Sequence, residues 1–249
     1  MATAALKEAA PETAADLRFV LDRAALLKSL GHVQSVVERR GTIPILANVK
    51  LETAGGLLNL TATDMDIAVE DKVEAQVEAE GATTVPAHMF YDIIRKLPDG
   101  AQVEITTDAA TGKVSIHAGP AKFALSSLPV DDFPAMSDGE LAVNFTLKSA
   151  DCLALIDKAR FAVSTEETRY YLNGIYLHAA ENDGSQVLRA VATDGHRLAR
   201  IEVPLPTGAA GMPGVIIPRK TIGEIKKLIE EGVEEVGVAL SDTKIRFTC

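Results

Sequence analysis

The chain carries an internal repeat, and this repeat limits the folds that it can adopt more than any other feature does. Val191–Arg200 reads VATDGHRLAR, and the upstream segment Leu60–Val69 reads LTATDMDIAV. In both segments an apolar strand ends in Ala-Thr-Asp, a turn follows, and a second strand begins. Asp64 and Asp194 are 130 positions apart (194 − 64). A repeat at this distance predicts a duplicated domain.

The first copy is predicted to alternate strands with two helices. Apolar residues at helical spacing predict one helix after Asp22 and a second over residues 87–97. Asp22 is a suitable N-cap, because its carboxylate can accept hydrogen bonds from the first unpaired amides of the helix. Gly55-Gly56 indicates a hairpin. The predicted strands are 17–21, 48–52, 57–63, 67–77, 83–86, 103–106, 114–117 and 123–126.

The same order restarts after a linker at 129–140. Phe145 lies 126 positions after Phe19 (145 − 19), and Pro218 lies 132 positions after Pro86 (218 − 86). Because the step hardly drifts, we predict a tandem duplication, with domains at 17–128 and 141–249. The predicted strands of the second copy are 143–147, 174–178, 187–193, 215–218, 236–240 and 244–247.

Two helices are predicted in the second copy as well. Ser149 is expected to cap the first of them, and the second follows Pro218 and carries Ile222, Ile225, Leu228 and Ile229. The apolar face of the helix after Ser149 is predicted to consist of Leu153, Ile156, Ala159 and Ala162.

The two ends of the chain carry weaker signals. Residues 1–16 are expected to form a disordered leader, since they lack the apolar core of a secretory signal. No run approaches the roughly 18 apolar residues of a membrane span, so a cytoplasmic protein is expected. The second copy stops before any counterpart of 123–126, so the chain is expected to be incomplete in its second domain.

Cys152 and Cys249 have no partners at zinc-ligand spacing, and Cys152 is expected to pack as a small apolar side chain.

Charge is unevenly distributed along the chain. The net charge of −10 argues against binding nucleic acid by whole-surface attraction. The strands and loops are rich in acids, whereas cations gather on the predicted helices, which predicts a basic helical face that can lie near phosphates. The cations in question are Arg23, Lys28, Arg39, Arg40, Arg95, Lys96, Lys158, Arg160, Arg219, Lys220, Lys226 and Lys227.

Catalytic chemistry finds little support in the motifs. Asp64 and Asp66 form an Asp-x-Asp pair that is compatible with a divalent metal, but they have no third ligand nearby and turn formation explains Asp64 equally well. Asp194 and His196 are compatible with an acid/base pair, but no nucleophile stands at a recognisable spacing. Phosphate-binding glycine motifs are absent from the sequence. We therefore predict no catalytic residues, no metal site and no cofactor.

Two neighbouring stretches favour binding instead. Tyr170 and Tyr171 follow Arg169, and on a strand they would face opposite sides, so that one of them should be exposed and able to stack on a base or a sugar. A shallow apolar patch suited to short peptides is predicted near the second repeat turn. It comprises Leu172, Thr193, Gly195 and Leu198, with His196 and Arg197 beside them.

Seven short motifs stand in a specific order and at specific joint spacing. They are Ile43–Leu46, Thr83–Ala87, Leu97–Gly100, Asp132–Pro134, Arg169–Gly174, Ala192–Ala199 and Val215–Lys220. Taken together in order, these motifs resemble the bacterial DNA polymerase III β subunit, the sliding clamp, and the resemblance covers residues 17–249.

The resemblance implies an α+β fold of tandem DNA-clamp domains, each with two helices packed on antiparallel sheets. It implies three domains per chain and a head-to-tail homodimer that encircles double-stranded DNA and has no active site. Short peptides of DNA polymerase III, other polymerases, the clamp loader and repair proteins would dock on it. Arg40, Tyr170, Tyr171, Arg219 and Lys220 match family positions that face DNA. The matches to the peptide-binding cleft are Leu172, Thr193, Gly195, His196, Arg197 and Leu198.

The third domain is missing from this chain, so we expect it to be a monomer with an incomplete peptide cleft. Two other functions remain open: a metal-dependent nucleotidyl enzyme that uses Asp64 and Asp66, and a duplicated scaffold that binds peptides without DNA.

Overall fold

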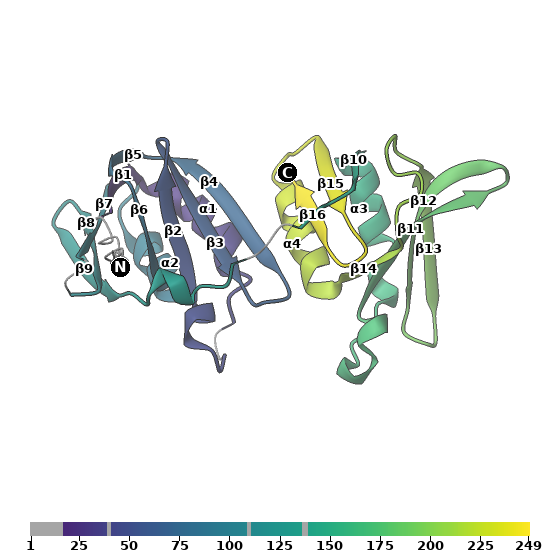
Figure 1. The fold of residues 1–249 in the computed structure, drawn as a ribbon, viewed down its shortest axis with the longest axis horizontal. Helices are drawn as coiled ribbons and strands as arrows, with labels where there is room; N and C mark the ends of the chain where they lie inside the picture. The colour runs from purple at the N-terminus through teal and green to yellow at the C-terminus, as the bar shows by residue number, and fades with distance from the viewer. Residues whose placement is uncertain (1–16, 39–40, 109–110, 136–138) are drawn as a thin grey trace, which may run out of the picture. The chain divides into compact units, whose positions relative to one another are not determined.

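The computed structural model describes residues 17–38, 41–108, 111–135 and 139–249 (Figure 1). The chain divides into two compact units between residues 136 and 137, which lies inside the predicted linker. The first unit ends at residue 136 and the second begins at residue 137. Arg40 and the predicted leader, 1–16, lie outside the described residues.

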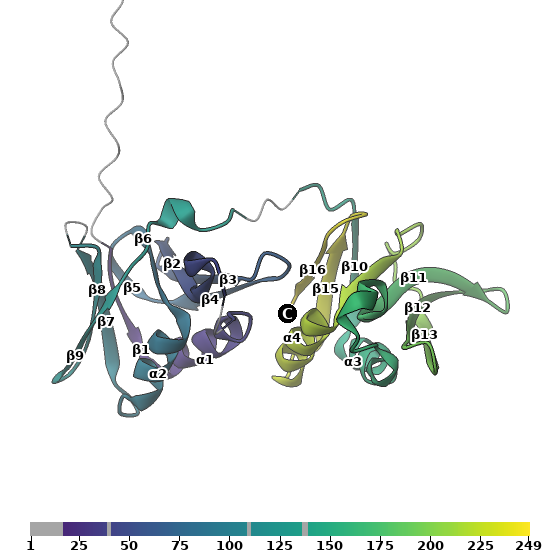
Figure 2. The ribbon, with the colours of Figure 1, turned by 90° about the horizontal axis from the view of Figure 1, so that it is seen from below.

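The first unit consists of two antiparallel sheets and two helices. The strand orders are β5-β1-β7-β8-β9 and β4-β3-β2-β6, and Figure 2 shows α1 and α2 side by side. The elements are β1 (Arg18–Asp22), α1 (Arg23–Gln34), η1 (Pro44–Ala47), β2 (Asn48–Ala54), β3 (Leu57–Thr63), β4 (Ala68–Glu74), β5 (Gln76–Ala79), β6 (Gly81–Pro86), α2 (Ala87–Lys96), β7 (Gln102–Asp108), β8 (Lys113–Ala118), β9 (Ala121–Ser126) and η2 (Val130–Asp132).

Local sequence explains how these elements begin and end. The Asp22 carboxylate caps α1 as predicted, because it accepts hydrogen bonds from the amides of Ala24 at 2.8 Å and Ala25 at 3.3 Å. Gly55 and Gly56 have φ values of 58° and 80°, which the tight hairpin between β2 and β3 requires. Between the sheets and helices lies one apolar core, in which Phe19 and Phe90 are fully buried.

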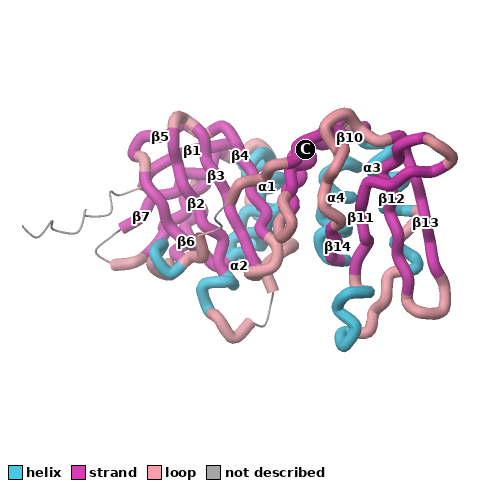
Figure 3. Tube along the Cα trace, turned by 45° about the vertical axis from the view of Figure 1, so that its right-hand side comes forward, coloured by secondary structure: helices cyan, strands magenta, loops and turns pink. Residues whose placement is uncertain are grey.

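The second unit repeats this plan. Its sheets have the orders β13-β12-β11-β14 and β10-β15-β16, and α3 and α4 lie behind β11 to β13 in Figure 3. The elements are β10 (Val143–Lys148), α3 (Ser149–Asp157), η3 (Arg160–Ala162), η4 (Glu167–Leu172), β11 (Gly174–Asn182), β12 (Ser185–Thr193), β13 (Leu198–Pro204), β14 (Val215–Pro218), α4 (Arg219–Glu230), β15 (Glu235–Leu240) and β16 (Ile245–Thr248).

Each strand of the second unit has a counterpart in the first. The sheet β4-β3-β2-β6 corresponds to β13-β12-β11-β14, and β1-β7-β8 corresponds to β10-β15-β16. Among the described elements, β5 and β9 have no counterpart in the second unit. The predicted fold class, α+β with two helices on antiparallel sheets in each copy, is therefore confirmed.

The repeated Thr-Asp turns share four hydrogen bonds between a side chain and the backbone. The hydroxyl of the threonine donates to the carbonyl four residues on, in Thr63 at 2.9 Å and in Thr193 at 2.8 Å. The aspartate Oδ1 accepts two backbone amides, at 3.0 and 2.8 Å in Asp64 and at 3.0 and 2.9 Å in Asp194. The duplication therefore preserved a scaffold on which different side chains are displayed.

Three local predictions were wrong. The predicted strand over 67–77 is two strands, because the chain passes at Ala75 from pairing with β3 to pairing with β1. Ser149 is the first residue of α3 and makes no side-chain cap bond; its amide donates to the Glu234 carbonyl at 2.9 Å. The helix ends at Asp157, so Ala159 and Ala162 follow it, although both remain fully buried.

Candidate functional site

A 3-10 segment, η4, brings the predicted site residues of the second unit together. At its end, the Leu172 carbonyl accepts the Ser164 amide at 3.0 Å, and the Asn173 carbonyl accepts the Arg219 amide at 2.9 Å. The first turn of α4 therefore lies beside the end of η4. On the other side, Nη1 of Arg169 lies 3.4 Å from the position that a side-chain carbon on Gly195 would occupy.

The adjacent tyrosines lie in η4 and not on a strand, which corrects the strand assumed for them. A kink at Arg169, with φ −109° and ψ 56°, interrupts the segment. Consequently both rings point outward, with Tyr170 79% and Tyr171 55% exposed, and they meet edge to face at 5.6 Å. Two aromatic rings held in this way offer faces for stacking.

The second repeat turn displays Arg197 and Leu198. Nε of Arg197 donates to Oδ2 of Asp194 at 2.9 Å, and Leu198 is 64% exposed at the start of β13. Gly195 has a φ of 90°, and the matching Met65 of the first unit has a φ of 83°, so the turn itself demands this left-handed conformation. Thr193 supports the turn through its hydroxyl, and His196 is exposed on it.

The sequence reasoning missed Phe161. Its ring is 54% exposed in η3, and the guanidinium carbon of Arg197 lies 5.4 Å from the ring centroid. The available signal was the comparison of the two copies, because Ser35 stands at the matching position of the first copy.

The predicted DNA-facing cations lie at helix ends. Arg219 and Lys220 are the first two residues of α4, a helix with no acid in its first turn. Cations are disfavoured there by the helix dipole, which instead favours an anion. Arg95 and Lys96 end α2 in the first unit, where Arg95 pairs with Asp92 at 3.0 Å.

Several other helix cations serve internal contacts, which reduces the predicted basic face. Arg23 donates to the carbonyls of Ile94 and Arg95 and pairs with Asp99 at 2.7 Å, so it closes the C-terminal end of α2. Lys226 joins α4 to α3 by a 2.8 Å bond to Asp157. Lys227 and Arg160 also pair with acids, Glu224 at 2.8 Å and Asp157 at 3.8 Å.

Of the groups weighed for metal binding or catalysis, Asp64 and Asp194 have structural roles. The carboxylates of Asp64 and Asp194 accept backbone amides in their turns. Cys152 is buried as predicted, and burial raises the pKa of its thiol to about 12. Among the described residues, no three His, Cys, Asp or Glu side chains form a group that could hold a metal ion. None of the helices described is long and apolar enough to cross a membrane.

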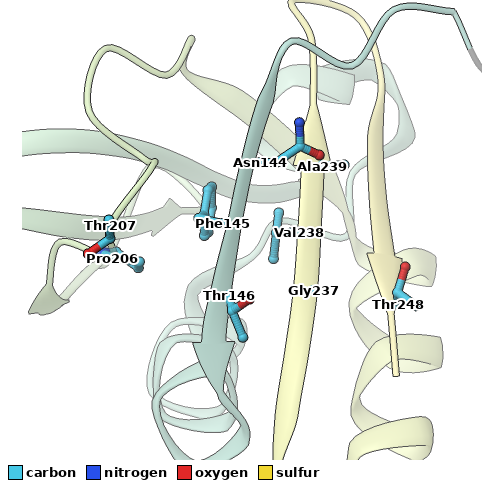
Figure 4. Close-up of a pocket in the computed structure, with 9 residues that line it drawn as sticks. All are labelled: Asn144, Phe145, Thr146, Pro206, Thr207, Gly237, Val238, Ala239 and Thr248. Atoms are coloured by element: carbon cyan, nitrogen blue, oxygen red, sulfur yellow. The ribbon is translucent and has the colours of Figure 1, made fainter.

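A separate hollow of about 650 Å³ lies over β10 and β15 (Figure 4). Gly237 and Ala239 leave space in the strand β15, and Pro206 and Thr207 border it beside β10. Of the described residues, those lining it include no ionisable side chain and none of the predicted site residues. The hollow is therefore distinct from the turn and from η4.

The hydrogen bonds that Asp194 accepts predict how the stability of the second Thr-Asp turn depends on pH. Hydrogen bonds from the amides of Arg197 and His196, followed by the Arg197 side chain, lower the pKa of Asp194 from 3.8 to about 2. Because this pKa is depressed, the carboxylate stabilises the folded turn at pH above 3.8, and the contribution is lost as the pH falls through about 2. A carbon NMR titration should give a midpoint near that value. In Arg197→Met the midpoint should rise only in part, since the amides remain. A midpoint of 3.8 in the unaltered chain would contradict the geometry.

Comparison with known proteins identifies the family. Residues 17–137 match the model of the DNA polymerase III beta subunit, N-terminal domain, and residues 146–249 match that of its central domain. The chain belongs to the DNA polymerase III beta subunit family. The resemblance drawn from the motifs is thereby confirmed.

Curated relatives agree with this assignment. The chain is 51% identical over 231 residues to the beta sliding clamp of Caulobacter vibrioides, covering 93% of this chain and 62% of that protein. It is 37% identical over 233 residues to the beta sliding clamp of Escherichia coli, covering 92% of this chain and 61% of that protein. The chain thus spans about 62% of the length of such relatives.

Solved structures share the fold. The Caulobacter crescentus beta sliding clamp matches with a TM-score of 0.91 at 51% identity, covering 93% of this chain and 62% of that one. A sliding clamp of Bartonella birtlesii, solved bound to griselimycin, matches with a TM-score of 0.90 at 47% identity, covering 94% and 62%.

Proposed function

We propose that the chain supplies two domains of a sliding clamp, a ring that encircles double-stranded DNA and holds the replicative polymerase on it. The observation that carries this function is the tandem of two like units, matched in order to the N-terminal and central domains of the family. A ring of similar domains acts by topology and needs no active site. The protein is therefore a non-catalytic subunit that confers processivity, and it works in the cytoplasm with the DNA.

Duplex DNA would pass the helical side of the units. Arg219 and Lys220 place two positive charges at the start of α4, and Tyr170 and Tyr171 present rings in the adjacent η4. In the first unit, Arg95 and Lys96 are exposed at the end of α2, and Arg40 completes the set by its motif match. Few, partly paired cations suit a ring that slides, because weak phosphate contacts leave it mobile.

Short peptides would dock on the second unit, at the wall formed by the repeat turn and η4. Leu198 supplies exposed apolar area, Arg197 and His196 supply polar contacts, and Leu172 lies at the end of η4; Thr193 and Gly195 shape the turn. DNA polymerase III, other polymerases, the clamp loader and repair proteins are the proposed partners. Griselimycin, bound by the Bartonella birtlesii clamp, is a further ligand to expect.

Ring closure would use a sheet edge. β9 ends its five-stranded sheet, so one side of it carries unpaired backbone groups, and Phe123 on it is 39% exposed. Such an edge can be extended by a strand of another subunit. We propose a head-to-tail homodimer at the length of the relatives, and a monomer for the 249 residues alone.

Topological retention on DNA tests this function. The protein at the length of its relatives is loaded onto nicked circular DNA by a bacterial clamp loader and washed in high salt. A ring should remain on the circle and leave after the DNA is cut, because salt removes phosphate contacts but not linkage. Equal behaviour on circular and linear DNA would reject the clamp. A magnesium titration separates the enzyme alternative, which requires a stoichiometric site at Asp64 and Asp66.

A further inference from the structure

The side chain of Arg197 is held in place although it is mostly exposed. Its Nε donates to Asp194 at 2.9 Å, and its guanidinium carbon lies 5.4 Å from the centre of the Phe161 ring. The Arg197 side chain is 59% exposed and Phe161 is 54% exposed. The edge of the guanidinium is thus occupied by a carboxylate and its face by a ring, which leaves few orientations for its remaining N–H groups.

The first unit shows that the fold does not require this pair. Two pairs of matching residues lie on either side of Phe161 and set the alignment of the copies: Phe19 with Phe145, and Asn48 with Gly174. Each pair is separated by 126 positions (145 − 19, 174 − 48), so Ser35 occupies the place of Phe161 in the first unit. The burial pattern around it is the same, with buried residues at 33, 36 and 37 and at 159, 162 and 163.

The matching residue of Arg197 is Ile67, whose carbonyl accepts the same threonine bond. Ile67 is 8% exposed and Ser35 bonds to its own helix through the His32 carbonyl at 3.0 Å. Both positions therefore differ between the copies, and in the second unit both point outward. Phe161 and Arg197 bury less than half of their surface, so a role in packing the second unit does not explain why large side chains stand at these two positions.

The remaining N–H groups of Arg197 are suited to an anion. Among the described residues, Nη1 and Nη2 of Arg197 make no hydrogen bond, and a guanidinium edge matches a carboxylate in geometry. Leu198 follows directly and is 64% exposed. A ligand that meets both would carry a carboxylate next to an apolar side chain.

We propose that Phe161 is a positioning residue that orients Arg197 so that the peptide dock selects segments with a carboxylate beside a leucine. This deepens the peptide-binding role proposed above and rests on it. The carboxylate can belong to an aspartate or to the end of a peptide chain. Phe161 itself need not touch the peptide.

The test is an NMR titration of the isotopically labelled protein at the length of its relatives. Three six-residue probes are used: one with a leucine followed by aspartate and an amidated end, one with asparagine in place of the aspartate, and the asparagine peptide with a free terminal carboxylate. The Gly195 amide reports binding. The unaltered chain should bind the aspartate or free-carboxylate probe about three- to fivefold more tightly than the amidated asparagine probe, as expected for an exposed ion pair.

Phe161→Leu should lower this preference to near one while affinity for the amidated asparagine probe stays within about twofold, since leucine keeps the apolar surface but not the ring. Phe161→Tyr should restore the preference. Met89→Leu, a change at an exposed apolar residue of the first unit, is the control and should change nothing. Thermal unfolding of each variant verifies the fold.

Each other outcome overturns the inference in a distinguishable way. An unchanged preference in Phe161→Leu removes the positioning role and leaves the dock intact. Binding without preference in the unaltered chain removes the carboxylate selection. Absence of any Gly195 shift with all three probes rejects the peptide dock itself, and the positioning role with it.

Discussion

Replacing Leu198 with alanine is expected to weaken binding of a clamp-binding peptide by about ten- to one-hundredfold, the range of an interface hot spot. Leu198 is 64% exposed at the start of β13, so its apolar surface is available to a partner and contributes little to the core. Burying a leucine side chain contributes about 1.5–3 kcal/mol. Fluorescence anisotropy with a labelled polymerase peptide, on the protein at the length of its relatives, measures the change.

The matched control is Leu57→Ala. Leu57 is 37% exposed at the start of β3 in the first unit, far from the second-unit turn in sequence. It should leave peptide affinity unchanged, and both variants should keep the unfolding temperature of the unaltered protein within a few degrees. If Leu198→Ala binds as tightly as the unaltered protein, the repeat turn is not the peptide dock.

Replacing Gly174 with alanine is expected to destabilise the second unit by about 3 kcal/mol, at the upper end of the cost of overpacking. Its φ is not in the left-handed region, so the reason is space: an added carbon would lie 2.4 Å from the Ile217 carbonyl oxygen and 2.7 Å from the Ile216 side chain. The clash would separate β11 from its partner strand β14. The strand β14 leads directly into α4, whose first two residues are Arg219 and Lys220. Urea unfolding, followed separately for each unit, measures the loss.

Gly223→Ala is the control for this change. Gly223 lies within α4, and a carbon added there meets nothing within 4 Å. Alanine should therefore raise the stability of the second unit by about 0.5–1 kcal/mol through its better helix propensity. Equal stability of Gly174→Ala and the unaltered chain would show that β14 can move away from β11 at little cost.

The repeat made most of the fold predictable. Apolar periodicity reports which residues face a core, and two copies of the same pattern reinforce each other, so the order of strands and helices could be read in both units. Asp22 and the Gly55-Gly56 hairpin were also predictable, because a cap and a tight turn depend on neighbouring residues only.

The errors arose where distant contacts decide the outcome. The break at Ala75 depends on two different partner strands, β3 and β1. The Ser149 amide donates to the Glu234 carbonyl, 85 positions away (234 − 149), and Ser149 is the first residue of α3, so its hydroxyl does not stand at the capping position. Gly174 illustrates the same limit. Its counterpart in the first unit is Asn48, whose larger side chain fits there and donates a hydrogen bond to the Thr84 hydroxyl at 2.9 Å.

The candidate site divides along the same line. By itself, the sequence determined the Thr-Asp turns and the exposed leucine after the second of them, since these are local patterns. For Tyr170 and Tyr171 it predicted a strand with one exposed ring, whereas both rings are exposed in η4. Tertiary structure alone decided that η4 lies between the turn and α4, that Arg23 closes α2 instead of joining an exposed basic face, and that Phe161 lies against Arg197. The physical reason is that side-chain partners are chosen by packing between segments far apart in the chain, and periodicity along one segment carries no record of that choice.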